Sequence, residues 1–156
     1  MKNIDFIFVG DSKNKAFSQL EKEYHEKVTR YTSSKIEIIK DSAEKNMLVK
    51  KRNETLSILK KVEPNNMIII CDENGKSFDS RAFSEKISQW QVAAQRVVFI
   101  IGGAYGIDIE NLLPIKSGSI KLRLSDFVMP HELARIVLLE QVYRALTILN
   151  GEKYHH

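Results

Sequence analysis

The segment 131–149, HELARIVLLEQVYRALTIL, restricts the fold of this chain more than any other stretch. Pro130 precedes it and Gly151 follows it, and these residue types are the usual start and stop signals of a helix. Apolar residues are spread around nearly the whole circumference of this predicted helix, rather than along one stripe. A helix of this kind is buried on most of its sides.

A chain of 156 residues can readily cover one side of such a helix, but hardly all of it. A second copy of the chain is the natural cover for the remaining apolar surface, so the pattern predicts a homodimer. The alternative is a central core helix within a monomer.

Length and composition indicate one domain, residues 1–156, which is large enough to fold without a disulfide or a metal. Cys71 is the one cysteine, and no zinc-ligand spacing is present, so we expect no metal site. The first ten residues do not resemble a signal peptide, and no apolar run approaches the roughly 20 residues that cross a bilayer. These features favour a soluble cytoplasmic protein with no membrane segment.

Basic residues are concentrated in the first part of the chain. Residues 1–65 contain 14 Lys and Arg against 10 Asp and Glu, whereas residues 66–156 contain 10 of each kind. The densest basic group is Lys50, Lys51 and Arg52, on a helix predicted over 44–62, and it is a candidate for contacts with RNA phosphates. An ordinary solvated helix face is the alternative.

Strands and helices alternate along the sequence. The residues 67–71 and 96–101 form continuous apolar runs, which are typical of central parallel strands covered on both faces. The remaining pattern predicts strands at 3–9, 36–39 and 119–124 and helices at 13–31, 44–62, from Ser80 onward, and 108–113, with a polar turn at 72–76. This order indicates an α/β fold with a mainly parallel sheet flanked by helices.

A glycine-rich turn, Gly102-Gly103-Ala104-Tyr105-Gly106, follows the second apolar strand. Ligands of α/β proteins bind at this end of parallel strands, where glycine lets the backbone approach closely. The spacing matches neither the dinucleotide fingerprint nor the phosphate loop. Taken alone, the turn can equally well serve to reverse the chain.

Several motifs together resemble one family. They are Ile101-Gly102-Gly103-x-x-Gly106, Leu124-Ser125 before Pro130-His131, Arg135-x-x-x-x-Glu140-Gln141-x-Tyr143-Arg144, and Tyr154-His155 near the end. This ordered set resembles the RlmH family, bacterial SPOUT-class methyltransferases that modify a pseudouridine in 23S rRNA. The resemblance extends over the whole chain.

The resemblance implies a single α/β domain whose C-terminal segment forms a trefoil knot, a homodimer, and S-adenosylmethionine as the cofactor. It implies methylation of N3 of a pseudouridine in 23S rRNA, on assembled ribosomes. Two alternatives stay open: a methyltransferase of the same fold that acts on tRNA, and a ribosome-associated RNA-binding protein without catalysis.

Three loops would form the cofactor site of such an enzyme. The residues that correspond are Cys71, Gly102, Gly103, Leu124, Ser125, Asp126, Phe127, Val128 and Met129. Backbone groups in these loops can read the polar edge of adenine, while Leu124 and Met129 cover its apolar faces. Cys71 stands where relatives often have Leu, which makes that contact looser.

The resemblance links the tail residues Tyr154 and His155 to substrate handling. We expect Tyr154 to stack on the target base or bond to it, and His155 to position it or relay its proton. Arg135 is a third candidate, because a charge on so apolar a helix needs a partner such as an RNA phosphate or a carboxylate. His131 is more simply explained as a helix cap.

Overall fold

The computed structural model describes residues 2–108, 110 and 118–156. Strands and helices alternate, which confirms the predicted α/β class. The elements are β1 (Asn3–Val9), α1 (Lys15–Val28), β2 (Ile36–Ile39), α2 (Met47–Leu59), β3 (Met67–Lys76), α3 (Ser80–Ala93), β4 (Arg96–Ile101), β5 (Ile120–Leu122) and α5 (His131–Leu149). The helix predicted at 108–113 falls mostly outside the described residues.

The five described strands form one sheet in the order β2-β1-β4-β3-β5, and every neighbouring pair is parallel. The two apolar runs of the sequence, in β3 and β4, pair with each other near the centre of the sheet. Because all strands run in the same direction, their carboxyl ends lie along one edge. The predicted parallel sheet is therefore confirmed, whereas the trefoil knot stays a prediction.

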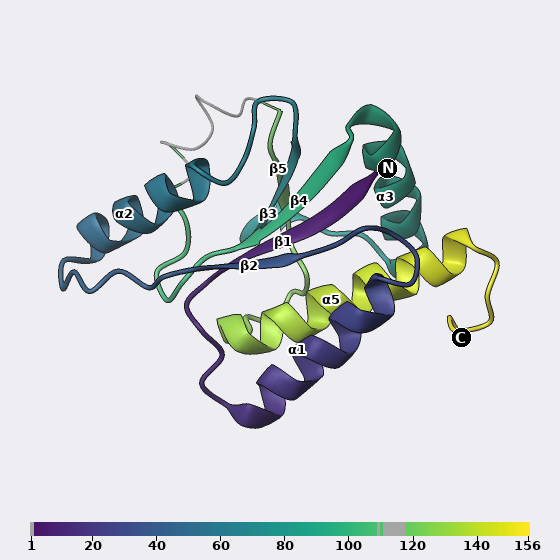
Figure 1. The fold of residues 1–156 in the computed structure, drawn as a ribbon, viewed down its shortest axis with the longest axis horizontal. Coiled ribbons are helices and arrows are strands. Elements are labelled where there is room, and N and C mark those ends of the chain that lie inside the picture. The colour runs from purple at the N-terminus through teal and green to yellow at the C-terminus, as the bar shows by residue number, and fades with distance from the viewer. Residues whose placement is uncertain (1, 109, 111–117) are drawn as a thin grey trace.

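Helices cover both faces of the sheet (Figure 1). One face packs against α1, α3 and α5, and its core includes Phe6, Phe99 and Leu138. The other face packs against α2, with Ile58 among its buried residues. Alternate residues of β1 enter opposite cores, as the pleat of a strand requires.

The apolar helix α5 lies between α1 and α3, beside the sheet (Figure 1). This single chain buries one side of the helix and leaves the other side partly accessible, as expected for a chain of this length. Its outward residues, such as Leu133, Val137 and Ile148, are only half-buried, and Leu149 is exposed. The homodimer stays a prediction.

Strand β3 is longer than predicted. The polar residues 72–76, expected to form a turn, continue the strand, and Lys76 lies opposite Leu122 of β5 after an irregularity in register. A Cβ atom on Gly75 would lie 2.7 Å from backbone atoms of β5, so glycine permits this close approach. Residues 72–76 therefore form part of the strand because their backbone pairs with β5, although their polar side chains are typical of a turn.

Helix α2 buries polar residues and exposes apolar ones. Leucine side chains of a surface helix are expected to face the core, but Leu48 and Leu56 are 70% and 48% exposed. Glu54, Thr55 and Ile58 are buried instead. Two of these three residues are polar, and their hydrogen bonds, described below, offset the cost of burial. Within the part of the chain that the structure describes, no helix combines the length and apolar character needed to cross a bilayer.

Candidate functional site

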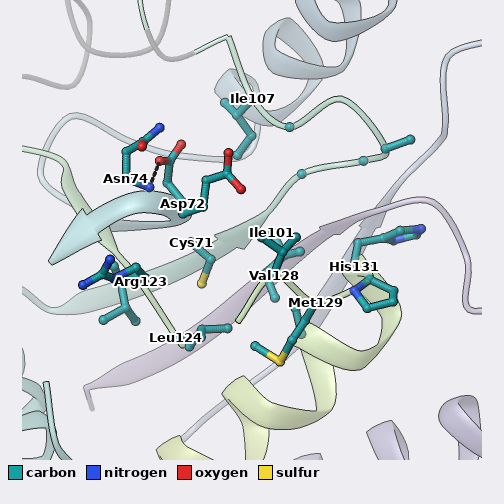
Figure 2. Close-up of a pocket in the computed structure, with 18 of the residues that line it drawn as sticks. Cys71, Asp72, Asn74, Ile101, Ile107, Arg123, Leu124, Val128, Met129 and His131 are labelled. Atoms are coloured by element: carbon teal, nitrogen blue, oxygen red, sulfur yellow. Dashed lines mark hydrogen bonds between the residues drawn. The ribbon is translucent and has the colours of Figure 1, made fainter. Parts of the chain in front are cut away.

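A cavity of about 710 Å³ opens at the carboxyl ends of β3, β4 and β5. Figure 2 shows Cys71, Leu124, Val128 and Met129 gathered on one side of it, with Ile107 across the cavity. The lining residues are Lys51, 71–74, 101–107, 122–125, 127–131 and Ala134. The sequence had placed a ligand site at this end of the sheet, and the cavity lies there.

Eight of the nine predicted cofactor-binding residues line this cavity. They are Cys71, Gly102, Gly103, Leu124, Ser125, Phe127, Val128 and Met129. Asp126 is the exception: its side chain is 86% exposed, and it forms an ion pair with Arg123 at 3.2 Å. Three loops distant in sequence thus meet at one cavity, as the resemblance implies.

Cys71 contributes an uncharged wall to the cavity. Burial raises the pKa of its thiol from the ordinary 9.0 to about 12, so the side chain is a neutral thiol at physiological pH. Its sulfur points toward the same side of the cavity as Leu124 (Figure 2). A small apolar group at this position suits contact with a flat, uncharged ring.

The glycines of the 102–106 turn are required by the chain itself. A Cβ atom on Gly102 would lie 2.8 Å from the carbonyl carbon of Gly106, and one on Gly103 would lie 2.9 Å from Oε1 of Glu54. Gly106 has a φ of +78°, and its N–H donates to the carbonyl of Gly103. The space that Gly102 and Gly103 leave is therefore occupied by other atoms of the chain, and these glycines are needed for the close packing of the turn.

Polar residues at the end of β3 line the cavity but were missed in the sequence, because 72–76 was interpreted only as a turn. Asp72 accepts a hydrogen bond from the backbone N–H of Asn74 at 2.7 Å (Figure 2), and Glu73 also lines the cavity. Their position directly after a buried parallel strand was the available signal.

His131 also lines the cavity, although the sequence suggested only a helix cap. Its Nδ1 atom is buried and has no hydrogen-bond partner among the described residues. The residue before it, Pro130, is the N-cap of α5, and no side chain caps this helix. A buried nitrogen without a partner at a cavity wall is available to a ligand.

The C-terminal tail is held against the last turns of its own α5. The hydroxyl of Tyr154 donates to Glu140 at 3.1 Å, and its ring packs edge-on against Tyr143 with centroids 4.7 Å apart. Arg144 lies over the Tyr154 ring, and its Nη1 is 3.3 Å from Nδ1 of His155. These contacts anchor both candidate residues of the tail.

The environment of Tyr154 keeps its phenol protonated. Burial, followed by the neighbouring Glu140 carboxylate, raises the pKa of Tyr154 to about 12. Near neutral pH this side chain therefore donates a hydrogen bond and offers a ring for stacking. It does not serve as a base.

The cavity and the tail contact different parts of α5. The cavity contacts His131 and Ala134 at the start of the helix, whereas Tyr154 folds back against Glu140 and Tyr143. From Ala134 to Glu140 the helix rises about 9 Å. Neither Tyr154 nor His155 lines the cavity, so one subunit does not bring the predicted cofactor residues and the tail residues together.

Arg135 is completely buried next to the first strand. It donates to the carbonyls of Val9 and Gly10 at 2.6 and 2.8 Å, and it lies over the ring of Phe8. It is not among the residues that line the cavity. Its Nη1 also lies 4.0 Å from Oε2 of Glu21, so a carboxylate of the same chain, the second of the two expected partners, accompanies the backbone carbonyls. These contacts tie α5 to the end of β1.

The three residues of the predicted basic patch have different surroundings. Lys50 forms ion pairs with Asp41 at 2.8 Å and with Glu54 at 3.1 Å, so its charge is balanced within the chain. Lys51 lines the cavity, and Arg52 is exposed. The described residues contain no group of three or more His, Cys, Asp or Glu side chains placed to hold a metal ion.

Comparisons with solved structures support the fold. The chain superposes on a probable methylase family protein from Haemophilus influenzae with a TM-score of 0.58 and 11% identity, covering 99% of this chain and 71% of that one. It also superposes on ribosomal RNA small subunit methyltransferase E from Neisseria gonorrhoeae, solved bound to S-adenosyl methionine. The TM-score is 0.54 with 14% identity, over 95% of this chain and 66% of the other.

Comparisons of sequence are more specific. The family model described as Predicted SPOUT methyltransferase matches residues 1–155. A ribosomal RNA large subunit methyltransferase H from Mycoplasmopsis agalactiae is 40% identical over 99% of both chains, and one from Parabacteroides distasonis is 34% identical over 98% of both. The chain therefore belongs to the SPOUT methyltransferase family, among the large-subunit ribosomal RNA methyltransferases of the RlmH group.

Proposed function

We propose that this protein transfers a methyl group from S-adenosylmethionine to N3 of a pseudouridine in 23S rRNA, on assembled ribosomes in the cytoplasm. The observation that carries the proposal is the cavity at the carboxyl ends of β3, β4 and β5, in which eight predicted cofactor residues meet. The names of the relatives support an RNA of the large ribosomal subunit as the substrate.

The residues of the cavity fit S-adenosylmethionine. Its volume of about 710 Å³ lies within the usual range for sites of small molecules. Cys71, Leu124 and Met129 offer apolar contacts for the adenine ring, and the loop 124–129 offers backbone groups for its edge. The buried Nδ1 of His131 offers a hydrogen-bonding group that has no partner among the described residues.

The chemistry asks little more of the protein than alignment and removal of a proton. S-adenosylmethionine supplies an electrophilic methyl group, and N3 of pseudouridine is an imide nitrogen that must lose its proton. Tyr154 orients the base through stacking or as a hydrogen-bond acceptor, since its hydroxyl proton is donated to Glu140. The imidazole of His155 positions the base or relays the N3 proton.

Completing this site requires a second subunit. We infer that the active form is a homodimer in which the tail of one subunit meets the cavity of the other, because within one chain the tail packs against Glu140 and Tyr143 and does not line its own cavity. Phe127 and Val128 beside the cavity are 85% and 80% exposed, and a partner would cover such large apolar side chains.

The test is methyl transfer from labelled S-adenosylmethionine, offered separately to intact ribosomes, free rRNA and tRNA, followed by nucleoside analysis. The proposal expects 3-methylpseudouridine from ribosomes. Label in tRNA alone would refute the proposed substrate and keep the reaction class. No transfer, together with no calorimetric binding of S-adenosylmethionine, would favour a non-catalytic RNA-binding protein.

A further inference from the structure

Two buried polar side chains of α2 lie directly behind the glycine turn of the cavity. Thr55 is fully buried and Glu54 is 2% exposed, although both belong to a helix with several exposed apolar residues. Neither residue lines the cavity. Two of the buried positions of α2 are thus occupied by polar side chains. Their hydrogen bonds explain why polar residues are found there.

Thr55 fixes the segment that leaves the turn. Its Oγ1 accepts a hydrogen bond from the backbone N–H of Asp108 at 2.9 Å and donates to the carbonyl of Lys51 at 2.8 Å. Asp108 directly follows Ile107, which lines the cavity. One hydroxyl thus connects α2 with the backbone that shapes this wall.

Glu54 supports the beginning of the same turn. Its Oε2 accepts from the backbone N–H of Ser42 at 2.9 Å and pairs with Lys50 at 3.1 Å. Its Oε1 is buried, has no hydrogen-bond partner among the described residues, and leaves no room for a Cβ atom on Gly103. The Oε2 atom of Glu54 is thus held by Ser42 and Lys50, and its Oε1 atom lies next to Gly103 of the turn.

We propose that Thr55 and Glu54 are positioning residues of the cofactor site, which hold the 102–108 segment in its binding shape by fastening it to α2. Glycine-rich segments lose much conformational entropy when they are ordered, so a fixed support lowers the cost of binding. The inference rests on the proposed function in one respect: it assumes that the cavity binds S-adenosylmethionine.

The first test compares Thr55→Val, which keeps the shape of the side chain but loses the hydroxyl, with Thr55→Ser, which keeps the hydroxyl. S-adenosylhomocysteine is the calorimetric probe, because its binding requires no RNA. We expect Thr55→Val to weaken binding roughly 2- to 10-fold, the usual range for one hydrogen bond, and to raise KM for S-adenosylmethionine more than it lowers kcat. Thr55→Ser restores the binding.

Ser57→Ala is the matched control. Ser57 lies on the same helix, and its hydroxyl donates to the carbonyl of Asn53 within that helix. This variant should bind S-adenosylhomocysteine as the unmodified protein does. A Thr55→Val protein that unfolds at lower urea concentration, yet binds the probe with unchanged affinity, would overturn the positioning role.

A second set of variants tests Glu54 and remains informative if Thr55→Val does not fold. Gly103→Ala should weaken binding, because the added methyl group crowds Oε1 of Glu54. Combining it with Glu54→Asp, whose side chain is one methylene shorter, should recover part of the loss. If Gly103→Ala weakens binding of S-adenosylhomocysteine by the same factor with or without Glu54→Asp, the proposed contact between Glu54 and the turn is refuted. If the unmodified protein fails to bind the probe, the proposed cofactor is wrong and the inference falls with it.

Discussion

Mixed dimers provide a sharp test of how the active site is assembled. One variant, Gly102→Val, carries a damaged cavity, because even a Cβ atom at this position lies 2.8 Å from the backbone of Gly106. The other, Tyr154→Ala with His155→Ala, carries a damaged tail. Each homodimer alone should be nearly inactive. The question is whether a mixture of the two regains methyl transfer.

The expected recovery follows from the separate positions of the cavity and the tail within one subunit. If each site combines the cavity of one subunit with the tail of its partner, a mixed dimer contains one intact site and one doubly damaged site. Random exchange makes half of the dimers mixed, so the mixture should reach about 25% of the unmodified activity. If cavity and tail acted within one subunit, the mixture would regain none.

The assay is transfer of labelled methyl groups to ribosomes after the two variants have been unfolded together and refolded. Each variant refolded alone is the control, and size-exclusion chromatography verifies that all three samples are dimeric. Activity of the mixture no greater than the mean of the separate variants would refute the shared site. A monomeric unmodified protein would refute the dimer itself.

Three further predictions concern single residues. Lys51→Ala with Arg52→Ala should reduce the salt dependence of ribosome binding by about 0.7–0.9 log units per lost phosphate contact, whereas Lys50→Ala, whose charge is balanced internally, should leave the slope unchanged. Arg135→Met should lower the free energy of unfolding by about 1–3 kcal/mol in urea titrations, because two buried carbonyls lose their donor, while S-adenosylhomocysteine binding to the folded protein persists. The raised pKa of Cys71 predicts slow alkylation at pH 8 that accelerates toward pH 11. This pKa is about 12 in the folded protein and 9.0 ordinarily, so the protonated thiol stabilises the folded state below pH 9, and this stabilisation is lost as the pH rises toward 12. In the Cys71→Ala variant, Tm should therefore decline less steeply between pH 9 and pH 12. Fast alkylation at pH 8, or an unchanged decline, would contradict the buried thiol.

The order of elements was predictable because apolar periodicity reports burial directly. The runs in β3 and β4 are buried on both faces, as continuous apolar sequence indicates. The extension of β3 through Lys76 was not predictable, since its polar residues are held by pairing with β5, which is distant in sequence. The buried face of α2 was missed for a similar reason: Thr55 is polar, and its burial depends on a partner that only the fold supplies.

The resemblance, more than periodicity, located the candidate site. Eight of the nine predicted cofactor residues line the cavity, whereas the exposed Asp126 pairs with Arg123; their role in cofactor binding stays a prediction. Arg135 shows the limit of reasoning from charge alone. A cation on an apolar helix does need a partner, but its charge alone does not tell a phosphate of RNA from the Glu21 carboxylate and the two backbone carbonyls that Arg135 contacts in this chain.

The parallel sheet also governs how this chain can form during its own synthesis. Strand β1 pairs with β2 early, but its other edge pairs with β4, and Asn3 lies opposite Arg96. Until residue 101 has been made, this edge of β1 lacks its native partner strand, and β5 and α5 follow later still. Pairings of such long sequence separation form slowly and leave strand edges exposed to aggregation. We therefore expect the nascent chain to depend on chaperones until its last helix has been released.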